Sequence, residues 1–402
     1  MSTEHAPATR RELLHRLLDA LEEELVWAVS LRERLHALAE VSHDEHETAN
    51  VLRAALSDVS QASLDGAGFL VRVGDRARTG IAVRAELDAL PIVEATGAPF
   101  ASSNGHMHAC GHDVHMASLA AVVRAAATLE SELPAPLVAL FQPSEEAYPS
   151  GARAIVERAA ELAPIGAVVA VHVHPEIAWL SVAADSGAVN ASCDNVRIVI
   201  SGSPGHAAYP HRSNDPIAAL SQVIVTLQQV VSRRTDPTHG VAVTISWVRG
   251  GGADNAIPER AEAGGTLRVL DGGDRAGLRE LLREVVEHAA AACGCRGEVS
   301  FEEGEPRVIN DAALAASIRP ALERAGFELA PGLRSCGSDD FGYYGAVAPT
   351  LLGFVGLKGA PGDRDVPLHH PRFLPPPEAV AAVARAQIAA YVGAASSLGD
   401  PA

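Results

Sequence analysis

Short, continuous apolar runs occur in the first and last parts of the chain. Runs of this kind are typical of strands that are buried on both faces of a sheet. They predict strands at residues 80–85, 137–141, 167–171 and 350–355. Segments with apolar residues at helical spacing lie between these strands. These segments predict helices at residues 12–28, 30–38, 47–56, 114–129 and 152–158.

Strands that alternate with helices predict a layered α/β domain with a mainly parallel central sheet. Ligands of such sheets bind beyond the carboxyl ends of the strands. Polar side chains follow each of the four predicted strands, and they are Glu86 and Asp88, then Glu145 and Glu146, then His172, and, after a loop, His369. We therefore expect these side chains to share one site.

The pattern changes between about residues 191 and 303. It predicts strands at residues 195–201, 241–248, 263–270 and 298–301, and helices at residues 216–232 and 275–292. The resulting order, β-α-β-β-α-β, is that of a ferredoxin-like α+β unit. We therefore predict a first domain formed by residues 1–190 and 304–402, with a second domain, residues 191–303, inserted into it.

The chain has 402 residues, of which 48% are hydrophobic, so two domains with sizeable cores are expected. Its formal net charge is −18 and no basic stripe with interleaved aromatic residues occurs, which argues against a nucleic-acid partner. No apolar run approaches the ~20 residues of a membrane helix, which argues against a membrane partner. The charged N-terminus lacks the apolar segment of a signal peptide, and five cysteines, an odd number, indicate reduced thiols. We expect a cytoplasmic protein.

Residues 106–115 have an unusual composition for a soluble core. The chemically active side chains in this run are His106, His108, Cys110, His112, Asp113 and His115. Thiolate and imidazole are the groups that best hold zinc-like transition metals, and a carboxylate such as Asp113 can orient a ligating imidazole. The run therefore predicts half of a metal centre. A polar loop with incidental histidines is the alternative.

Two adjacent acids, Glu145 and Glu146, follow the strand at residues 137–141. Adjacent side chains project in different directions, so one carboxylate can bind a metal while the other acts as a general base. Such a pair suits amide hydrolysis, in which two ions ~3.5–4 Å apart lower the pKa of bound water to ~7 and clamp the carbonyl oxygen. Taken alone, His172 fits a half-buried structural histidine as well as it fits a ligand. His369 taken alone fits an exposed surface residue equally well.

Eight motifs occur in a fixed order along roughly residues 30–390. They are Arg84–Pro91, Met107–Asp113, Phe141–Glu146, His172–Pro175, Gly205–Ala208, Asn255–Pro258, Gly337–Phe341 and Leu368–Pro371. Together they resemble the dinuclear metal amidohydrolases, which include bacterial N-acyl-amino-acid aminoacylases, hippurate hydrolases and plant auxin-conjugate hydrolases. The run His-Ala-Cys-Gly-His-Asp at residues 108–113 is the most specific part of the resemblance.

This resemblance implies two divalent metal ions, for which zinc, manganese, cobalt and nickel are candidates. The implied metal ligands are Cys110, His112, Glu146, His172 and His369. Glu145 would act first as general base and then as general acid. Asp88 and Asp113 would support the ligands from behind.

The resemblance also assigns roles to the inserted domain. That domain would act as a lid and, as often in such proteins, as the surface of a homodimer. His206 would stabilise the oxyanion, either in its own site or in that of the partner subunit. Asn255 and Arg268 would anchor the α-carboxylate of a small-molecule substrate, although Arg268 also fits a surface arginine on a strand.

Three departures from the family pattern concern the surroundings of the site. Glu86 and Leu87 stand where the family commonly has aspartate and methionine, so the extra methylene of Glu86 is expected to shift a contact behind the ligands. Residues 147–151, Ala-Tyr-Pro-Ser-Gly, replace a glycine-rich turn and predict a stiffer loop that carries an aromatic ring. Asp339 replaces a glutamate. None of the three removes a predicted ligand.

The implied reaction is hydrolysis of the amide bond of an N-acyl amino acid to a carboxylic acid and a free amino acid. A water that bridges the metals would attack the acyl carbonyl, and Glu145 would carry its proton to the leaving amine. One alternative is a thiol amidase with Cys110 as nucleophile and His112 or His172 as its partner. Another is a non-catalytic metal-binding protein that keeps the fold. The acyl group and the amino acid are not predicted.

Overall fold

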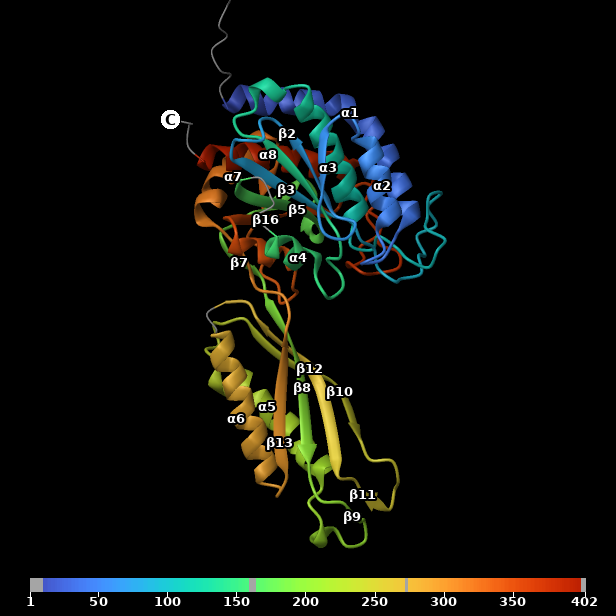
Figure 1. Cartoon of the computed structure of the whole chain (residues 1–402), viewed down its shortest axis with the longest axis vertical. Coiled ribbons are helices and arrows are strands. Elements are labelled where there is room, and N and C mark those ends of the chain that lie inside the picture. The colour runs from blue at the N-terminus through green and yellow to red at the C-terminus, as the bar shows by residue number, and fades with distance from the viewer. Residues whose placement is uncertain (1–9, 159–163, 272–273, 399–402) are drawn as a thin grey trace, which may run out of the picture. The chain divides into compact units, whose positions relative to one another are not determined.

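The computed structural model describes residues 10–158, 164–271 and 274–398, and its contacts divide the chain into two units. The first unit is built from residues 1–187, 309–333 and 343–402, and the second from residues 188–308 and 334–342. The segment at residues 334–342 joins the second unit, although the sequence pattern assigns it to the first. Figure 1 labels the helices and strands of both units.

An eight-stranded sheet forms the centre of the first unit, in the order β1-β2-β4-β3-β5-β16-β6-β15. Its four central strands are β4 (Leu137–Gln142), β3 (Gly80–Glu86), β5 (Ile165–Ala178) and β16 (Thr350–Lys358). They are parallel to one another, and they confirm the four strands predicted from the apolar runs. The outer strands are β1 (Ser60–Ser63), β2 (Phe69–Val73), β6 (Ser181–Ala183) and β15 (Glu328–Leu329).

Helices pack on this sheet and on one another. Helices α3 (His112–Ala127) and α8 (Glu378–Ser397) contact the central strands, and α1 (Arg10–Leu38) contacts both helices (Figure 1). The remaining helices of the unit are α2 (His46–Ala55), α4 (Gly151–Glu157) and α7 (Ala312–Arg324). The sequence predicts two helices where α1 is continuous. Within α1 the hydroxyl of Ser30 donates to the carbonyl oxygen of Val26, one turn earlier, at 3.2 Å, so this polar group is satisfied inside the helix.

Helix α8 is more apolar than the sequence analysis anticipates. The helix has 20 residues, and an 18-residue window within it has a mean hydropathy of 1.3, enough by length and composition to cross a membrane. However, 83% of that window is buried inside the protein, because α8 packs against β5 and against α1, α3 and α7. A helix covered on all sides is apolar all round. The expectation that no apolar run approaches 20 residues is therefore wrong, and α8 is a core helix.

Strand β5 continues past the point at which the sequence analysis ends it. The apolar run predicts an end at residue 171, beside His172, but β5 pairs with β16 as far as Ala178 opposite Lys358. Its pairing with β3 ends earlier, at Ala170 opposite Arg84. His172 therefore lies two residues beyond the last β3 pair, near the polar end of β3.

The second unit is a four-stranded antiparallel sheet in the order β10-β12-β8-β13. Its elements are β8 (Ser192–Ser201), α5 (Pro216–Arg234), β10 (Val241–Gly250), β12 (Arg260–Val269), α6 (Arg275–Ala291) and β13 (Arg296–Glu303). Helix α5 begins where the sequence predicts because Asp215 accepts from the backbone N–H groups of Ile217 and Ala218. One apolar cluster joins both helices to one face of the sheet. The predicted ferredoxin-like order is confirmed.

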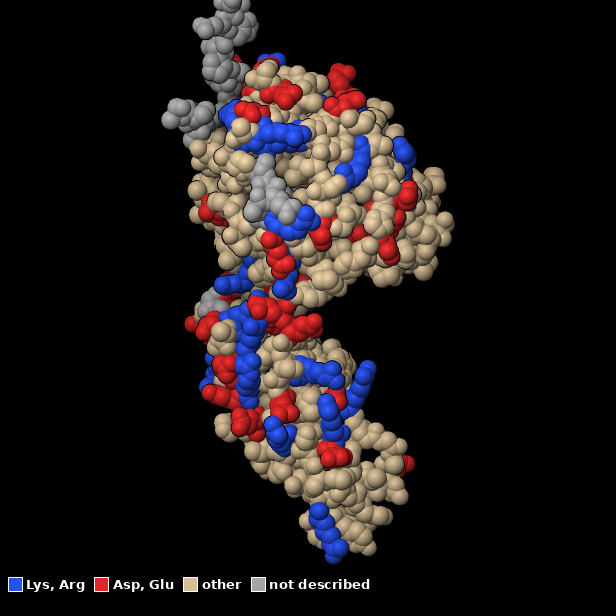
Figure 2. Space-filling view, in the orientation of Figure 1, with Lys and Arg blue, Asp and Glu red and all other residues tan. Residues whose placement is uncertain are grey.

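Charged side chains are mixed in sign on the face of the molecule in Figure 2, where the described lysine and arginine residues form no continuous patch. Several arginines of the second unit pair with acids instead, such as Arg197 with Glu262 at 2.7 Å. This distribution agrees with a formal net charge of −18. The face shown in Figure 2 therefore has no basic footprint of the kind that binds a polyanion such as nucleic acid.

Buried charges tie α1 to the first turn of α3. Arg32 Nε donates to Asp113 Oδ2 at 2.6 Å, and His36 Nδ1 donates to the same oxygen at 2.9 Å. His36 Nε2 lies 3.2 Å from Glu94 Oε1. The side chains of Arg32, His36 and Asp113 are at most 1% exposed. Because a buried carboxylate is costly without partners, this network holds Asp113, and with it the start of α3, against α1.

The same network raises the pKa of His36 to about 9. Burial lowers this pKa, but the charge of Asp113 and the hydrogen bonds to Asp113 and Glu94 outweigh the effect of burial. Burial raises the pKa of Asp113, but the charges of Arg32 and His36 outweigh this effect and hold the pKa well below its ordinary value. His36 is therefore a cation in the folded protein at neutral pH.

This assignment predicts how the stability of the first unit varies with pH. The folded pKa of His36 lies above the unfolded value of 6.5, so its stabilisation is complete below that value and is lost as the pH rises through about 9. The H36Q variant should melt below the wild type near pH 6, by the equivalent of ~3 kcal/mol at most, and the gap should close towards pH 10. Thermal unfolding of both proteins with saturating metal measures this gap. A gap that stays constant with pH, or that also appears for the exposed control H46Q, would contradict the assignment.

Candidate metal centre

The loop before α3 places Cys110 and His112 at the buried end of that helix. Gly111 occupies the N-cap position with φ of 84°, a left-handed conformation that glycine adopts readily. A Cβ atom at Gly111 would lie 2.6 Å from Cγ2 of Val173 on β5. Glycine therefore allows the loop to approach β5 closely, and the two flanking residues are buried, with Cys110 8% and His112 1% exposed.

Two further segments bring ligand atoms to Cys110. The Sγ atom of Cys110 lies 3.4 Å from Nε2 of His172. The Nε2 atom of His369 lies 3.3 Å from Oε1 of Glu146. One ligand atom from each of Cys110, Glu146 and His369 lies within 4.8 Å of the other two. These distances suit a group of side chains that share a cation.

His112 joins the same group through Glu146. Its Nε2 atom lies 4.0 Å from Glu146 Oε1 and 4.0 Å from Glu145 Oε2. Ligand atoms of these three residues lie within 4.8 Å of one another. The structure thus brings together the five residues that the sequence predicts as metal ligands, with the predicted base, Glu145, beside them. The side chain of Glu145 is 13% exposed, so solvent water can reach it.

The two buried imidazoles are oriented so that Nε2 of each points into the group. His172 Nδ1 lies 2.6 Å from the carbonyl oxygen of Val173, and His112 Nδ1 lies 2.9 Å from that of Asp88. A carbonyl oxygen can only accept, so both Nδ1 atoms carry the proton. In the neutral form of each ring, Nε2 then presents a lone pair towards the group, which is the form in which histidine binds a metal.

Unsatisfied polar atoms mark where a cation fits. His112 Nε2 and Glu146 Oε1 are both buried and lack a hydrogen-bond partner among the described residues. A buried acceptor without a partner is costly, and a bound cation would satisfy both atoms. The donor set, one thiolate, three imidazoles and a carboxylate, matches the ligands of zinc and its neighbours in the first transition row.

The electrostatic environment also favours positive charge. Burial raises the pKa of the Cys110 thiol well above its ordinary value, and the charges of Glu146, Glu145 and Glu86 raise it further. Burial lowers the pKa of His112, yet the hydrogen bond to Asp88 and the nearby carboxylates raise it to about 10. Burial and the charge of His115 lower the pKa of His172 well below its ordinary value, so this imidazole is neutral. A thiolate at Cys110 thus requires a compensating cation.

Asp88 orients two of the predicted ligands. Its carbonyl oxygen holds His112, and its Oδ2 atom accepts from the backbone N–H of Glu146 at 2.8 Å. Ser42 donates to the same oxygen at 2.7 Å. Asp113, the other residue predicted to support the ligands, gives its carboxylate to Arg32 and His36 and so acts on the start of α3.

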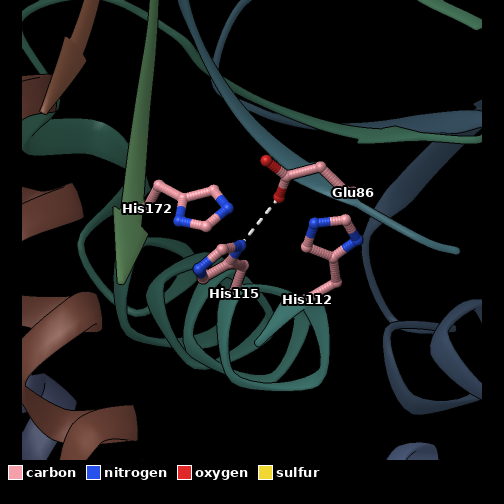
Figure 3. A group of neighbouring side chains, drawn as sticks. All are labelled: Glu86, His112, His115 and His172. Atoms are coloured by element: carbon pink, nitrogen blue, oxygen red, sulfur yellow. Dashed lines mark hydrogen bonds and ion pairs between the residues drawn. The ribbon is translucent and has the colours of Figure 1, made fainter. Parts of the chain in front are cut away.

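His115 belongs to the run predicted to form half of a metal centre, but the sequence assigns it no individual role. Figure 3 shows it beside His112 and His172 and bonded to Glu86. His115 Nδ1 donates to Glu86 Oε2 at 2.8 Å, and His115 Nε2 accepts from Val173 N at 3.1 Å. Both nitrogens are therefore occupied, and His115 supports β5 rather than binding a metal. Arg84 pairs with Glu86 from the other side. The spacing of His112 and His115, three residues apart on one helix, is the signal that could have indicated a shared face.

The predicted ligand His369 lies in a proline-rich loop. Its backbone N–H donates to the carbonyl oxygen of Ala109 at 2.9 Å, which ties the loop to the segment that carries Cys110. Its φ of 62° is a left-handed conformation that costs energy in a residue other than glycine. Its side chain is 49% exposed. His369 therefore forms the solvent-facing edge of the group.

The three residues predicted to bind substrate lie in the second unit. His206, in β9 (Gly205–His206), pairs with Ala256 of β11 (Ala256–Ile257), and Asn255 accepts from the N–H of Ala207 at 3.0 Å. His206 and Asn255 are thus neighbours. Arg268 lies on β12 near its C-terminal end, where its Nη1 donates to the carbonyl oxygen of Cys336 at 2.8 Å.

Comparison with known proteins places this chain in a family. The model of peptidase family M20/M25/M40 matches residues 82–391. The chain is 34% identical over 361 residues to N-acetyl-L-cysteine deacetylase of Bacillus subtilis, covering 89% of this chain and 84% of that protein. It is 33% identical over 357 residues to the IAA-amino acid hydrolase ILR1-like 4 of Arabidopsis thaliana, covering 86% and 81%.

A solved structure agrees with these relatives. The crystal structure of a dinuclear metal binding peptidase from the M20 family of Bacillus subtilis superposes with a TM-score of 0.79 and 30% identity, covering 92% of this chain and 98% of that chain. Both the fold and the sequence are therefore shared over most of the length. The chain belongs to peptidase family M20/M25/M40, a family of hydrolases, as the resemblance of its motifs to the dinuclear metal amidohydrolases predicts.

Proposed function

We propose that this chain hydrolyses the amide bond of N-acyl amino acids with the help of two divalent metal ions. The observation that carries the proposal is the convergence of five metal-binding side chains with Glu145 beside them. The relatives named above act on N-acetyl-L-cysteine and on IAA-amino acid conjugates, as their names state. An amino acid acylated on nitrogen is the substrate class common to both.

In this proposal Cys110, His112, Glu146, His172 and His369 hold the ions. Bound divalent cations would lower the pKa of an attacking water to ~7 and polarise the carbonyl of the scissile amide. The soft donors Cys110 and the three imidazoles favour zinc, although manganese, cobalt and nickel also accept such ligands. Five free cysteines among the described residues agree with a reducing, cytoplasmic location.

Glu145 acts on protons in the proposed reaction. Its carboxylate lies 4.0 Å from His112 Nε2, within reach of a water held among the ligands. It takes a proton as the water attacks the acyl carbon. It then returns that proton to the amide nitrogen, which must be protonated before the C–N bond breaks. The products are a carboxylic acid and a free amine.

We propose that His206 stabilises the oxyanion in the site of a partner subunit, and that the substrate carboxylate is bound by Arg268 of one subunit and Asn255 of the other. Distances within the second unit support this division of roles. His206 pairs with Ala256, which comes shortly before the start of β12 at Arg260. Arg268 lies near the other end of β12, opposite Cys193. At ~3.3 Å per residue, the strand between them spans ~26 Å. One small substrate cannot contact both side chains of a single copy, so a second copy would supply His206 together with its neighbour Asn255.

A thiol amidase with Cys110 as nucleophile fits the structure less well. Its thiolate would need a pKa near neutrality, whereas burial and three neighbouring carboxylates raise the pKa of Cys110. The imidazole next to it, His172, has a lowered pKa and donates its only proton to Val173. Neither feature assists a cysteine nucleophile. A non-catalytic homologue would not require Glu145 beside the ligands.

The E145Q variant tests the role of the base. Glutamine keeps the size of the side chain and removes its ability to take a proton, so turnover should fall by about 10²–10⁴-fold. Hydrolysis of acetyl, benzoyl and indoleacetyl amino acids with defined metals, together with metal content by elemental analysis, measures the effect. Metal content should remain that of the wild type, and the exposed control E157Q should remain active. Undiminished turnover of E145Q would refute this role.

Metal removal separates the metal mechanism from the thiol mechanism. Treatment with EDTA should abolish hydrolysis, and addition of Zn²⁺, Mn²⁺, Co²⁺ or Ni²⁺ should restore it, because the ions polarise the carbonyl. Initial rates before and after dialysis measure this. If the metal-free protein retained its rate and lost it on alkylation of Cys110, the thiol mechanism would be correct.

Subunit complementation tests whether His206 acts in the partner subunit. The H206A and E145Q variants should each be nearly inactive alone. After co-expression, a mixed dimer would contain one site with both functional residues, so the whole mixture should recover about a quarter of wild-type activity and the purified mixed dimer about half. Purification with two different tags isolates the mixed dimer for assay. Recovery should be absent if His206 serves its own site.

A further inference from the structure

Glu45 lies at the start of α2 but does not serve that helix. It occupies the N-cap position, where an acidic side chain commonly accepts from the first N–H groups of the helix, yet its side chain makes no such hydrogen bond. The residue is buried, at 1% exposed. Its Oε1 atom instead accepts from the backbone N–H of Ser144 at 2.7 Å and from the hydroxyl of Ser144 at 3.1 Å. The buried carboxylate of Glu45 thus pairs with a residue 99 positions away along the chain.

Ser144, which directly precedes Glu145, has a strained backbone. Its φ of 53° is left-handed, a conformation that costs ~1–2 kcal/mol in a residue with a Cβ atom. Such a conformation persists only where the surroundings hold it. The hydroxyl of Ser144 accepts from the backbone N–H of His43 at 3.0 Å, and its carbonyl oxygen accepts from Gly151 N at 2.9 Å. Together with Glu45, these contacts engage every polar group of Ser144.

Glu145 and Glu146 consequently have separate supports. The backbone N–H of Glu146 is held by Asp88 at 2.8 Å, and Asp88 also orients His112. The residue before Glu145 is held by Glu45. Loss of Asp88 would disturb predicted ligands, whereas loss of Glu45 would first disturb the peptide that leads into Glu145.

We propose that Glu45 is a positioning residue that fixes the left-handed Ser144 and thereby aims the carboxylate of Glu145 at the reacting atoms. The proposal rests on the function of Glu145 proposed above. Glu45, at the start of α2, would thus affect the reaction, although its position in the sequence does not indicate this. A displacement of about 1 Å in a catalytic group can cost ~10²-fold in rate, so a single lost anchor is sufficient to affect turnover.

The experiment compares three variants of the metal-loaded, full-length protein. E45A removes both hydrogen bonds to Ser144, E45Q keeps a carbonyl oxygen that can accept them, and E47A is an exposed control on the same helix. Each variant is assayed for kcat and KM on an N-acetyl amino acid, for metal content, and for the absorption spectrum of its Co²⁺-substituted form. The E145Q variant is assayed alongside.

We expect kcat of E45A to fall ~10–100-fold, with metal content and Co²⁺ spectrum like those of the wild type and KM within about threefold. E45Q should recover most of kcat, and E47A should equal the wild type. A purely structural role would instead lower metal content, or reduce the amount of folded protein without changing kcat per loaded site. Wild-type kcat in E45A, or a loss that follows metal content, would overturn the proposal.

A second variant covers the case in which E45A does not fold. S144G accepts a φ of 53° without strain and removes only the hydroxyl contacts to Glu45 and His43. It should fold, keep its metal and lose kcat, because the peptide before Glu145 is less constrained. Undiminished kcat in S144G would overturn the proposal. If E145Q itself retained full activity, the proposed function of the base would fail, whereas an inactive E145Q beside a fully active E45A would contradict only the role of Glu45.

Discussion

This site depends on one constraint, which is that its buried lone pairs need a positive charge close to them. Within a few ångströms the first unit gathers a thiol with a raised pKa, a neutral imidazole and a carboxylate oxygen without a hydrogen-bond partner. In a low-dielectric interior such groups repel one another or remain unsatisfied. Divalent cations remove both costs at once. Metal binding and the stability of the loops around the site should therefore be closely linked.

The fold meets this constraint with a set of buried contacts behind the ligands. The parallel strands bring the ends of β3 and β4 to the same edge as His172 within β5. Helix α3 contributes His112 from its first turn, and the loop before α3 contributes Cys110. Asp88 orients His112 and Glu146, and the pair of Arg32 and His36 holds the start of α3. These contacts come from segments that are far apart in sequence, which makes the geometry a property of the whole unit.

Much of the architecture follows from local pattern. The four central strands and the six elements of the inserted unit lie close to where apolar periodicity predicts them, because burial on one or two faces leaves a period in the sequence. The continuity of α1 is different, because Ser30 suggests a helix start in the sequence but lies inside the helix, with its hydroxyl bonded to Val26. The apolar character of α8 is visible in the sequence, but its cause, burial on every side, is not.

The site was predictable to the extent that its ligands carry distinctive chemistry. Cys110, His112 and the two glutamates stand out by residue type and spacing. The roles of His115 and Glu45 do not follow in this way, because the partners that define them, Glu86 and Ser144, are reached only through the fold. A single histidine or acid at a helix start has many possible uses, and local sequence cannot choose among them.

A crystal structure of the protein grown with Zn²⁺ or Mn²⁺, with anomalous scattering measured at the metal edge, tests the central claim most directly. The account predicts two anomalous peaks ~3.5–4 Å apart. Their ligands should be Cys110, His112, Glu146, His172 and His369, with Glu145 nearby and His115 still bonded to Glu86. A single peak, or ions bound at Glu86 and His115 and away from Cys110 and His369, would contradict it.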